Sequence, residues 1–418
     1  MSLFADLSWR GLIAHCTDPE ALAHDLDHGK ITSYVGFDPT APSLHMGNLL
    51  QLTLARRLQD YGHRPILLVG GSTGLIGDPR QSSERNLNPT ELVHAWGERI
   101  REQVERYVSF EGDNGAIIVN NYDWTQGLST LDFLRDIGKH FPVNRMLDRE
   151  VIKTRLETGI SYTEFSYVLL QSLDYLELHK KYGATLQTGG SDQWGNITAG
   201  VDLIRRVTGN KVHALSTPLV VREDGVKYGK TESGTLWMDG EMTSPYTFHQ
   251  YFLNIEDSMV GTFLRMFTKR SHEEIEELEK LTAESPHLRS AQRVLADDLT
   301  DLVHSVGQRE AATAAAKAIF GQGDLRELDK ATLEAVAGEL PLVVWEQFNG
   351  RTILDALSES AIFDSRSAAR RAVSEGGAYL NNERIVDADR ELCGEDLLAG
   401  SLMIIRRGKK TIGALRVG

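Results

Sequence analysis

The chain has 418 residues, of which 41% are hydrophobic and 25% are charged, so it is long enough for two to four domains with apolar cores. No apolar run reaches membrane-spanning length, which argues against channels, transporters and other membrane proteins. The two cysteines, Cys16 and Cys393, lie far apart and outside any CxxC pattern, which predicts neither a disulfide framework nor a zinc site. We therefore expect a globular protein of the reducing cytoplasm, with no membrane partner.

The net charge of −14 argues against a protein that coats nucleic acid by bulk charge. The charge is unevenly distributed, because residues 351–418 carry 11 Lys and Arg against 10 Asp and Glu, a net of +1, and the remaining chain carries −15. A nucleic-acid contact is therefore expected in a local patch, first of all in this C-terminal segment.

Apolar strand-like runs alternate with helical patterns after a helical lead-in at residues 1–30. We expect strands at 31–37, 65–71, 116–119, 186–190 and 218–221, and helices at 45–58, 88–107, 128–158, 163–181 and 196–207. This alternation predicts right-handed β-α-β crossovers, and therefore an α/β fold with a parallel sheet.

The character of the chain changes after Thr247. The patterns are helical to about Phe320, and residues 321–350 form a weakly patterned connector. A compact α+β unit is expected at 351–418, with helices at 352–357 and 365–374 and strands at 378–380 and 402–406.

The stretch from Tyr34 to Asn48 is a strand-to-helix junction rich in Pro, Ser and Thr. Open α/β sheets bind phosphates at such junctions, because free helix N–H groups and the helix dipole favour anions there. His45 and Asn48 can donate to phosphate or ribose oxygens, and Gly47 lets a flat ligand approach the backbone. An ordinary strand-to-helix turn explains the same residues equally well.

A second candidate is the loop that carries Lys227, Gly229 and Lys230. Mobile lysines suit a pyrophosphate leaving group, because its charge grows in the transition state. A solvated basic loop is the simpler interpretation of so short a match.

Polar residues also mark one face of an otherwise apolar helix. Tyr167, Gln171 and Asp174 are spaced at i, i+4 and i+7, which places all three on one side. Polar groups on a buried helix need partners, and either a polar small molecule or an internal network would supply them. Asp78 could likewise serve an ammonium group or a hydroxyl, or cap its loop before Pro79.

The segment 189–196 repeats the strand-to-helix arrangement at another strand end. Its alternative is a glycine turn with a helix cap. Two such junctions in one sheet, together with a lysine-rich loop, favour a nucleotide site between them.

Together these motifs resemble those of bacterial tyrosyl-tRNA synthetases, which are class I enzymes, along almost the whole chain. Residues 45–48 resemble the HIGH signature and residues 227–231 the KMSKS signature. The strings that are highly specific to this family are residues 74–79, 159–167 and 189–198. The resemblance implies four parts: a Rossmann-like catalytic domain at 1–230, an α-helical anticodon-arm domain at 231–320, a linker at 321–350 and a small α+β S4-like RNA-binding domain at 351–418.

The resemblance also implies the reaction. L-tyrosine is activated by ATP to tyrosyl-adenylate and pyrophosphate, and is then transferred to the 3′ end of tRNA(Tyr). ATP is a substrate, Mg²⁺ is expected to arrive with it, and no tightly bound metal or organic cofactor is expected. The family further implies a homodimer, with its interface around residues 133–147.

Particular residues receive roles from the same resemblance. The tyrosine contacts would be Tyr34, Asp78, Tyr167, Gln171, Asp174 and Gln193. The ATP contacts would be Gly36, Asp38, His45, Gly47, Asn48, Asp192 and Lys230. The groups that act on the transferring phosphates would be Thr40, His45, Lys227, Lys230 and Thr231, with Arg85 on a neighbouring loop. The RNA contacts would be Arg366, Arg370, Arg371, Arg407, Lys409 and Lys410, although Arg370 and Arg371 could instead pair with Glu375 or Asp364.

The sequence departs from the class signatures in places. Asn48 replaces the last histidine of HIGH, and Tyr228 and Gly229 replace the Met and Ser of KMSKS. Two other functions were weighed. An RNA-binding paralogue without aminoacylation is disfavoured by the intact set of site residues, and a dinucleotide-binding oxidoreductase is disfavoured because Gly36 belongs to no GxGxxG motif.

Overall fold

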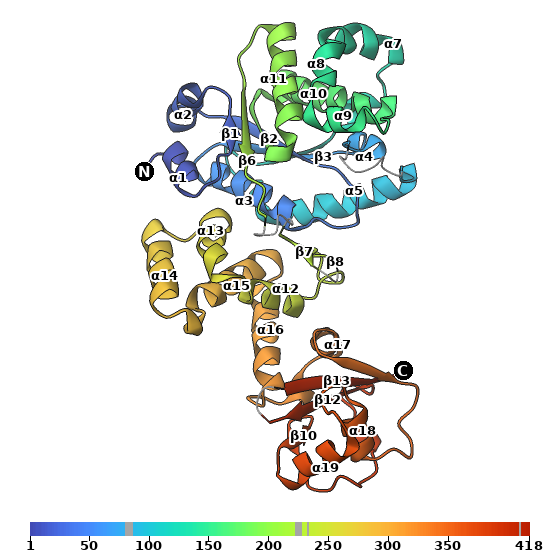
Figure 1. The fold of residues 1–418 in the computed structure, drawn as a ribbon. Helices are drawn as coiled ribbons and strands as arrows, with labels where there is room; N and C mark the ends of the chain where they lie inside the picture. The colour runs from blue at the N-terminus through green and yellow to red at the C-terminus, as the bar shows by residue number, and fades with distance from the viewer. Residues whose placement is uncertain (80–86, 222–227, 232–233, 409–410) are drawn as a thin grey trace. The chain divides into compact units, whose positions relative to one another are not determined.

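The computed structural model describes residues 1–79, 87–221, 228–231, 234–408 and 411–418, with the side chains of Lys230 and Thr231 left outside the description. The chain folds into two compact units. Unit 1 comprises residues 1–238 and 262–275, and unit 2 comprises residues 239–261 and 276–418. Figure 1 shows the elements of each unit along the chain. The finer division into four parts, with limits at 230, 320 and 350, stays a prediction.

Unit 1 is built on a six-stranded sheet with the order β1-β6-β5-β2-β3-β4. Its strands are β1 (His15–Cys16), β2 (Thr32–Phe37), β3 (Arg64–Val69), β4 (Ile117–Asn120), β5 (Ala184–Gly190) and β6 (His213–Thr217). All neighbours are parallel except β1, which is antiparallel to β6. The predicted parallel α/β fold is confirmed.

The fifth expected strand was placed wrongly. The strand is β6 at His213–Thr217, and not residues 218–221, because β5 already pairs with His213 through Thr217 and ends at Gly190. Pro218 follows, and its missing N–H cannot extend the ladder. The short strand β1 was also missed inside the lead-in, where only helix was expected.

Helices cover both faces of this sheet. Figure 1 shows α10 (Tyr162–Tyr182) and α11 (Trp194–Thr208) on one face and α3 (Met46–Asp60) and α5 (Thr90–Val104) on the other. The remaining helices of this unit are α1 (Leu3–Trp9), α2 (Pro19–His28), α4 (Thr73–Ile76), α6 (Tyr122–Thr125), α7 (Thr130–Asp132), α8 (Val143–Leu147) and α9 (Glu150–Arg155). A short hairpin of β7 (Lys230–Thr231) and β8 (Gly234–Thr235) follows β6 in the chain.

The start and end of α10 follow from its sequence. The Ser161 hydroxyl accepts from the Glu164 N–H at 3.3 Å, which caps the first turn. The helix ends at Gly183, whose φ of +68° is a left-handed conformation that glycine adopts without strain. These caps fix the register in which Tyr167, Gln171 and Asp174 face the same side of the helix.

Unit 2 begins with helices and ends with a second sheet. Its helices are α12 (Pro245–Leu253), α15 (Ser290–Val303), α16 (Val306–Ile319), α17 (Lys330–Gly338), α18 (Ile353–Glu359) and α19 (Arg366–Ser374). Two further helices, α13 (Asp257–Phe267) and α14 (His272–Glu284), run across the limits between the units. The sheet has the order β11-β10-β12-β13-β9. Its strands are β9 (Leu342–Trp345), β10 (Ala378–Leu380), β11 (Glu383–Arg384), β12 (Leu402–Arg407) and β13 (Thr411–Val417).

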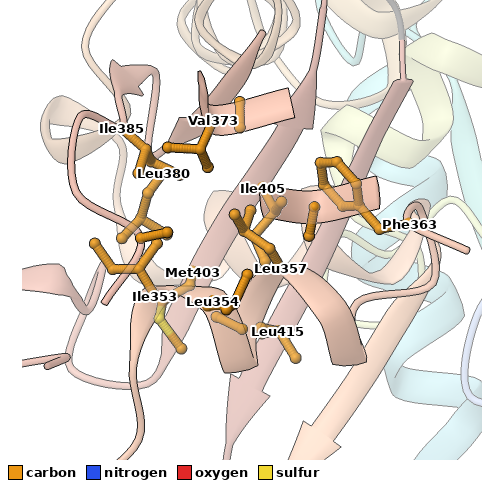
Figure 2. Close-up of a cluster of buried hydrophobic side chains, with 14 of the residues drawn as sticks. Ile353, Leu354, Leu357, Phe363, Val373, Leu380, Ile385, Met403, Ile405 and Leu415 are labelled. Carbon is orange, nitrogen blue, oxygen red and sulfur yellow. The ribbon is translucent and has the colours of Figure 1, made fainter. Parts of the chain in front are cut away.

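This second sheet is covered on both faces. Figure 2 shows the core on one face, where Ile353, Leu354 and Leu357 of α18 pack against Met403, Ile405 and Leu415 of the sheet. The alternate residues of β12, Leu402 and Ile404, belong to another core with α16 and α17. The segment 321–350 therefore carries α17 and β9, where the sequence indicated only a weakly patterned connector.

Among the described residues, no helix has both the length and the apolar character that a membrane crossing requires.

Candidate active site

The carboxyl ends of β2, β3, β4 and β5 carry the polar residues that the sequence singled out. Asp174 of α10 is buried and accepts two hydrogen bonds, from Asn121 Nδ2 at 3.0 Å and from Trp124 Nε1 at 3.0 Å. Asn121 follows β4 directly, and its Nδ2 also donates to Thr73 Oγ1 at 3.0 Å. The carboxylate is thus held by groups from a different part of the sheet.

A second carboxylate, Asp38, follows β2. Thr73 Oγ1 donates to its Oδ1 at 2.6 Å, and the Tyr167 hydroxyl donates to its Oδ2 at 2.6 Å. Gly70 makes room for this arrangement, because a Cβ there would lie 2.1 Å from Asp38 Oδ1. Burial, followed by the charges of Asp38 and Asp78, raises the pKa of Tyr167 above its usual value, so this hydroxyl stays a donor.

The third carboxylate, Asp78, lies in the loop after α4. Gln193 Nε2 donates to its Oδ2 at 2.7 Å and Asn196 Nδ2 donates to its Oδ1 at 3.0 Å. Asn196 Nδ2 also donates to Gln193 Oε1 at 2.9 Å. Hydrogen bonds therefore connect the second strand-to-helix junction, at 189–196, to the loop that carries Asp78, although the two were separate motifs in the sequence.

Some buried polar atoms at this site have no hydrogen-bond partner among the described residues. They include the Tyr34 hydroxyl on β2, Gln171 Oε1 on α10 and Gln187 Oε1 on β5. Tyr34 and Gln187 are register partners in the parallel pair β2–β5. An unpaired buried polar atom costs about 1–3 kcal/mol, so such a group calls for a partner that the described part of the chain does not supply.

Burial dominates the electrostatics of the site. It raises the pKa of Asp174 to about 7, against the opposing hydrogen bonds from Asn121 and Trp124. Burial, followed by the charge of Asp174, likewise raises the pKa of Tyr34 well above its usual value. A carboxyl group with a pKa near 7 can accept or hold a proton under ordinary conditions.

The start of α3 carries the residues that match HIGH. His45 is the N-cap, and its Nδ1 accepts from the Gly47 N–H at 3.1 Å, while Asn48 Oδ1 accepts from the His45 N–H at 3.0 Å. A Cβ at Gly47 would lie 3.1 Å from His45 Cε1, so the glycine allows the imidazole to fold over the first turn. These two side chains cap the first turn of the helix.

The lysine loop is described in part. Gly229 has a φ of +85°, and a Cβ there would lie 2.8 Å from Met46 Cβ at the start of α3. Tyr228 is buried and packs edge-on against Phe263, with ring centroids 4.8 Å apart. Gly229 thus lets the loop lie directly against the helix that carries His45. Lys227 and Arg85 lie outside the described residues, as do the side chains of Lys230 and Thr231.

The remaining predicted nucleotide contacts lie at the same edge of the sheet. Gly36 is on β2, where a Cβ would meet Leu68 Cδ2 at 3.5 Å. Thr40, which is exposed, follows β2, and its N–H donates to the Asp38 carbonyl at 2.8 Å. Asp192, also exposed, lies between β5 and α11.

Some network residues were not singled out from the sequence as site residues. They are Thr73, Asn121, Trp124, Arg149 and Asn196. A signal existed for Asn121, since it comes directly after a strand of a parallel sheet, where ligand-binding side chains gather. None existed for Arg149, because it lies in a surface-like helical segment far from the other site residues in the sequence.

The basic residues expected to contact RNA lie in unit 2, and three of the four that are described form ion pairs. Arg366 Nη1 lies 2.6 Å from Asp355 Oδ1, Arg370 Nη2 lies 2.7 Å from Asp389 Oδ1, and Arg407 Nη1 lies 3.9 Å from Asp364 Oδ2. Arg371 makes no ion pair within the described chain. The partner of Arg370 is thus neither Glu375 nor Asp364, the two alternatives considered from the sequence. Lys409 and Lys410 lie outside the described residues.

The possibility of a resident metal was also considered. The described ranges hold no group of three or more His, Cys, Asp or Glu side chains arranged to bind a metal ion.

Comparison with known proteins places the chain in a family. Residues 26–321 match the family model of class I tRNA synthetases for tryptophan and tyrosine. Residues 332–413 match the model of a tyrosine–tRNA ligase C-terminal domain. The chain therefore belongs to the class I tRNA synthetases, as the two strand-to-helix junctions and the parallel sheet indicate.

The curated relatives narrow this assignment. The chain is 59% identical to the tyrosine–tRNA ligase of Cutibacterium acnes, with 99% of each chain covered, and 55% identical to that of Streptomyces avermitilis, with 99% of this chain and 98% of the relative covered. A C-terminally truncated mitochondrial tyrosyl-tRNA synthetase from Aspergillus nidulans superposes with a TM-score of 0.69 at 28% identity, covering 76% of this chain and 94% of that one. Within its class, the chain belongs to the tyrosine–tRNA ligases.

Proposed function

We propose that the chain activates L-tyrosine with ATP and transfers the tyrosyl group to tRNA(Tyr), the reaction that the name of its family describes. In the first step a tyrosine carboxylate oxygen bonds to the α-phosphorus, and the bond from that phosphorus to pyrophosphate breaks. In the second step a hydroxyl at the 3′ end of the tRNA attacks the carbonyl carbon, and AMP leaves. The substrate supplies the nucleophile in each step, so the protein contributes position and charge.

The observation that carries the proposal is the pair formed by Tyr34 and Asp174. Both are buried, and the Tyr34 hydroxyl has no partner among the described residues. The phenol of a bound tyrosine can supply that missing partner, and its O–H can donate a hydrogen bond to the Asp174 carboxylate. A phenylalanine ring would leave these polar groups unsatisfied, so the site selects tyrosine without needing a second, editing site.

The ammonium group of tyrosine is assigned to Asp78, Tyr167 and Gln171. Asp78 carries the negative charge, and the donors Gln193 and Asn196 hold its two oxygens. Gln171 Oε1 is buried and unpaired in the described structure, and an ammonium N–H would satisfy it. Gln193 would then lie near the tyrosine carboxylate.

The nucleotide is assigned to the edge formed by the end of β2 and the start of α3. The residues involved are Gly36, Asp38, Thr40, His45, Gly47, Asn48 and Asp192. The positive end of the α3 helix dipole favours the phosphates. Lys227, Lys230 and Thr231 would close over the pyrophosphate as its charge develops, and Mg²⁺ bound to ATP would share that charge.

The remaining assignments concern partners. The C-terminal arginines are proposed to contact tRNA phosphates, and the protein is proposed to act in the cytoplasm. A homodimer is supported by exposed apolar side chains on the segment expected at its interface, among them Leu134 and Val143, which are 45% and 61% exposed. Light scattering on the purified chain measures this state directly.

Tyrosine-dependent ATP–pyrophosphate exchange tests the proposed reaction. Exchange is expected with tyrosine, and none with phenylalanine or tryptophan. Exchange with tryptophan but not with tyrosine would overturn the proposal. Charging of tRNA(Tyr) with labelled tyrosine tests the second step separately.

A further inference from the structure

Arg149 begins a chain of hydrogen bonds that ends at Asp78. It precedes α9, is partly buried, and donates through Nη2 to Asn196 Oδ1. Asn196 is 2% exposed and donates from Nδ2 to Asp78 Oδ1 and to Gln193 Oε1. Gln193 in turn donates from Nε2 to Asp78 Oδ2.

The direction of these bonds is set at one end. A carboxamide has an acceptor end and a donor end, and either end fits the same space. A guanidinium only donates, so Arg149 requires the oxygen of Asn196 to face it, which turns the Asn196 NH₂ toward Asp78 and Gln193. That NH₂ requires the oxygen of Gln193 to face it, which turns the Gln193 NH₂ toward Asp78.

Without the Arg149 guanidinium, the side-chain amides of Asn196 and Gln193 have no preferred orientation. Turning both of them over would place Asn196 Oδ1 and Gln193 Oε1 against the Asp78 carboxylate, where acceptors face acceptors. Such a carboxylate would be shifted or protonated and would be a poor partner for a cation.

Two further observations show that the arginine is fitted to this place. Its side chain lies against the first turn of α11, where a Cβ at Gly195 would come within 3.3 Å of Arg149 Nε. Within the described chain it forms no ion pair with a carboxylate, and burial lowers its pKa against the direct attraction of the Asp78 charge. A cation at a helix N-terminus is unfavourable by itself, so the hydrogen bond to Asn196 and the attraction of Asp78 together account for its position.

We propose that Arg149 is a positioning residue for substrate binding, which orients Asn196 and Gln193 so that Asp78 presents an ionised, correctly aimed carboxylate to the ammonium group of the amino acid. The inference rests on the proposed function, because it takes from there that Asp78 meets the ammonium group. It assigns to Arg149 no contact with either substrate.

Inhibition of exchange by two small phenols separates this role from general damage. Tyramine and 4-ethylphenol differ by the ammonium group. In R149M we expect the inhibition constant of tyramine and the KM for tyrosine to rise about tenfold, with the inhibition constant of 4-ethylphenol and the KM for ATP unchanged. Equal weakening of both phenols would overturn the inference.

A double variant tests whether the effect passes through Asn196. If it does, R149M/N196A binds tyramine no more weakly than N196A alone. A loss of tyramine affinity in the double variant equal to the product of the two single losses would contradict this route. R149K, which keeps a donor, should lose less than R149M, and N196D, which places an oxygen against Asp78, should lose more than R149M.

Arg205 provides a matched control near the C-terminal end of α11. It is exposed and pairs with Asp202 at 3.0 Å, so R205M should leave all four constants unchanged. The wild type is measured first. If it fails to exchange with tyrosine, the proposed function is wrong; if it exchanges normally and R149M keeps its affinity for tyramine, only the role of Arg149 is wrong. Thermal melting shows that each variant is folded.

Discussion

Polar side chains are organised in opposite ways in the two units. In unit 1, the described contacts of Asp38, Asp78 and Asp174 come from neutral donors, namely hydroxyl, amide and indole groups. In unit 2, the arginines expected to bind RNA are exposed, and three of them are held by carboxylates, as with Arg370 and Asp389. The first arrangement holds acidic groups in fixed positions within a site, and the second neutralises charge on a surface.

The difference follows from what each surface must do. A carboxyl group held by neutral donors can bind a small cation or a phenol with little change in its geometry. An exposed ion pair is worth about 0–1 kcal/mol, so a phosphate can take the arginine from its carboxylate at little cost. The unit 1 site is therefore preformed, while the basic surface of unit 2 forms fully when RNA replaces the acidic partners.

The largest effect is expected at Asp174. In D174N one of the two donors, Asn121 or Trp124, would face an NH₂ group, and the acceptor for the phenol would be weakened. We expect kcat/KM for tyrosine in exchange to fall on the order of a thousandfold, about 4 kcal/mol. Retention of tyrosine activation would contradict the preformed site.

The same residue gives a pH-dependent stability. Its folded pKa of about 7 lies above the ordinary value of 3.8, so between these values the folded chain keeps a proton that the unfolded chain releases. The free energy of unfolding should therefore fall as pH rises from about 5 to 7, by about 2–3 kcal/mol from this group. Denaturant titrations of the wild type and D174N at both pH values measure it. The decline should be smaller in D174N, and equal declines would assign it to other groups.

A smaller effect is expected at Gly229. The class signature has serine here, but in this chain a Cβ would meet Met46 at 2.8 Å and the φ is +85°. In G229S the strain of about 1–2 kcal/mol should move the loop off α3 and slow exchange about tenfold. Tyrosine binding measured by calorimetry should not change. Weakened tyrosine binding would show that the loop contributes to the tyrosine site, which contradicts a role limited to ATP.

The smallest effects are expected at the C-terminal arginines. R371A should reduce the slope of tRNA affinity against salt concentration by about one counterion, because Arg371 has no acidic partner to leave within the described chain. D389A, which frees Arg370, should strengthen tRNA binding slightly, with a change in unfolding free energy below about 0.5 kcal/mol. Filter binding at several salt concentrations measures both. Weaker binding in D389A would mean that the pair itself is recognised.

Local patterns predicted the parts of the fold that local chemistry decides. The spacing of Tyr167, Gln171 and Asp174 placed them correctly on one face of α10, and strand-to-helix junctions predicted the edge where the polar residues meet. Contacts between residues that are distant in the sequence depend on the order of the strands and on helix packing, so local patterns did not predict them. Asn121 reaches Asp174 because β4 lies at the edge beside β3, and Arg149 reaches Asn196 because its side chain lies against the first turn of α11. Strand β9, within the segment 321–350, was not predictable from its own residues because it depends on a parallel partner, β13, that lies about 70 residues later.

The coverage of the second sheet on both faces has a consequence for how this chain can be divided. The C-terminal family model begins at residue 332, but Ala312, Ala315 and Ile319 of α16 share one apolar core with Ile404 and Ala414 of the sheet. A fragment cut at that limit would expose this core to water and would tend to aggregate. The segment that matches the C-terminal family model is thus shorter than the smallest fragment that we expect to fold. An excision, fusion or domain exchange should keep α16 together with the strands of the second sheet.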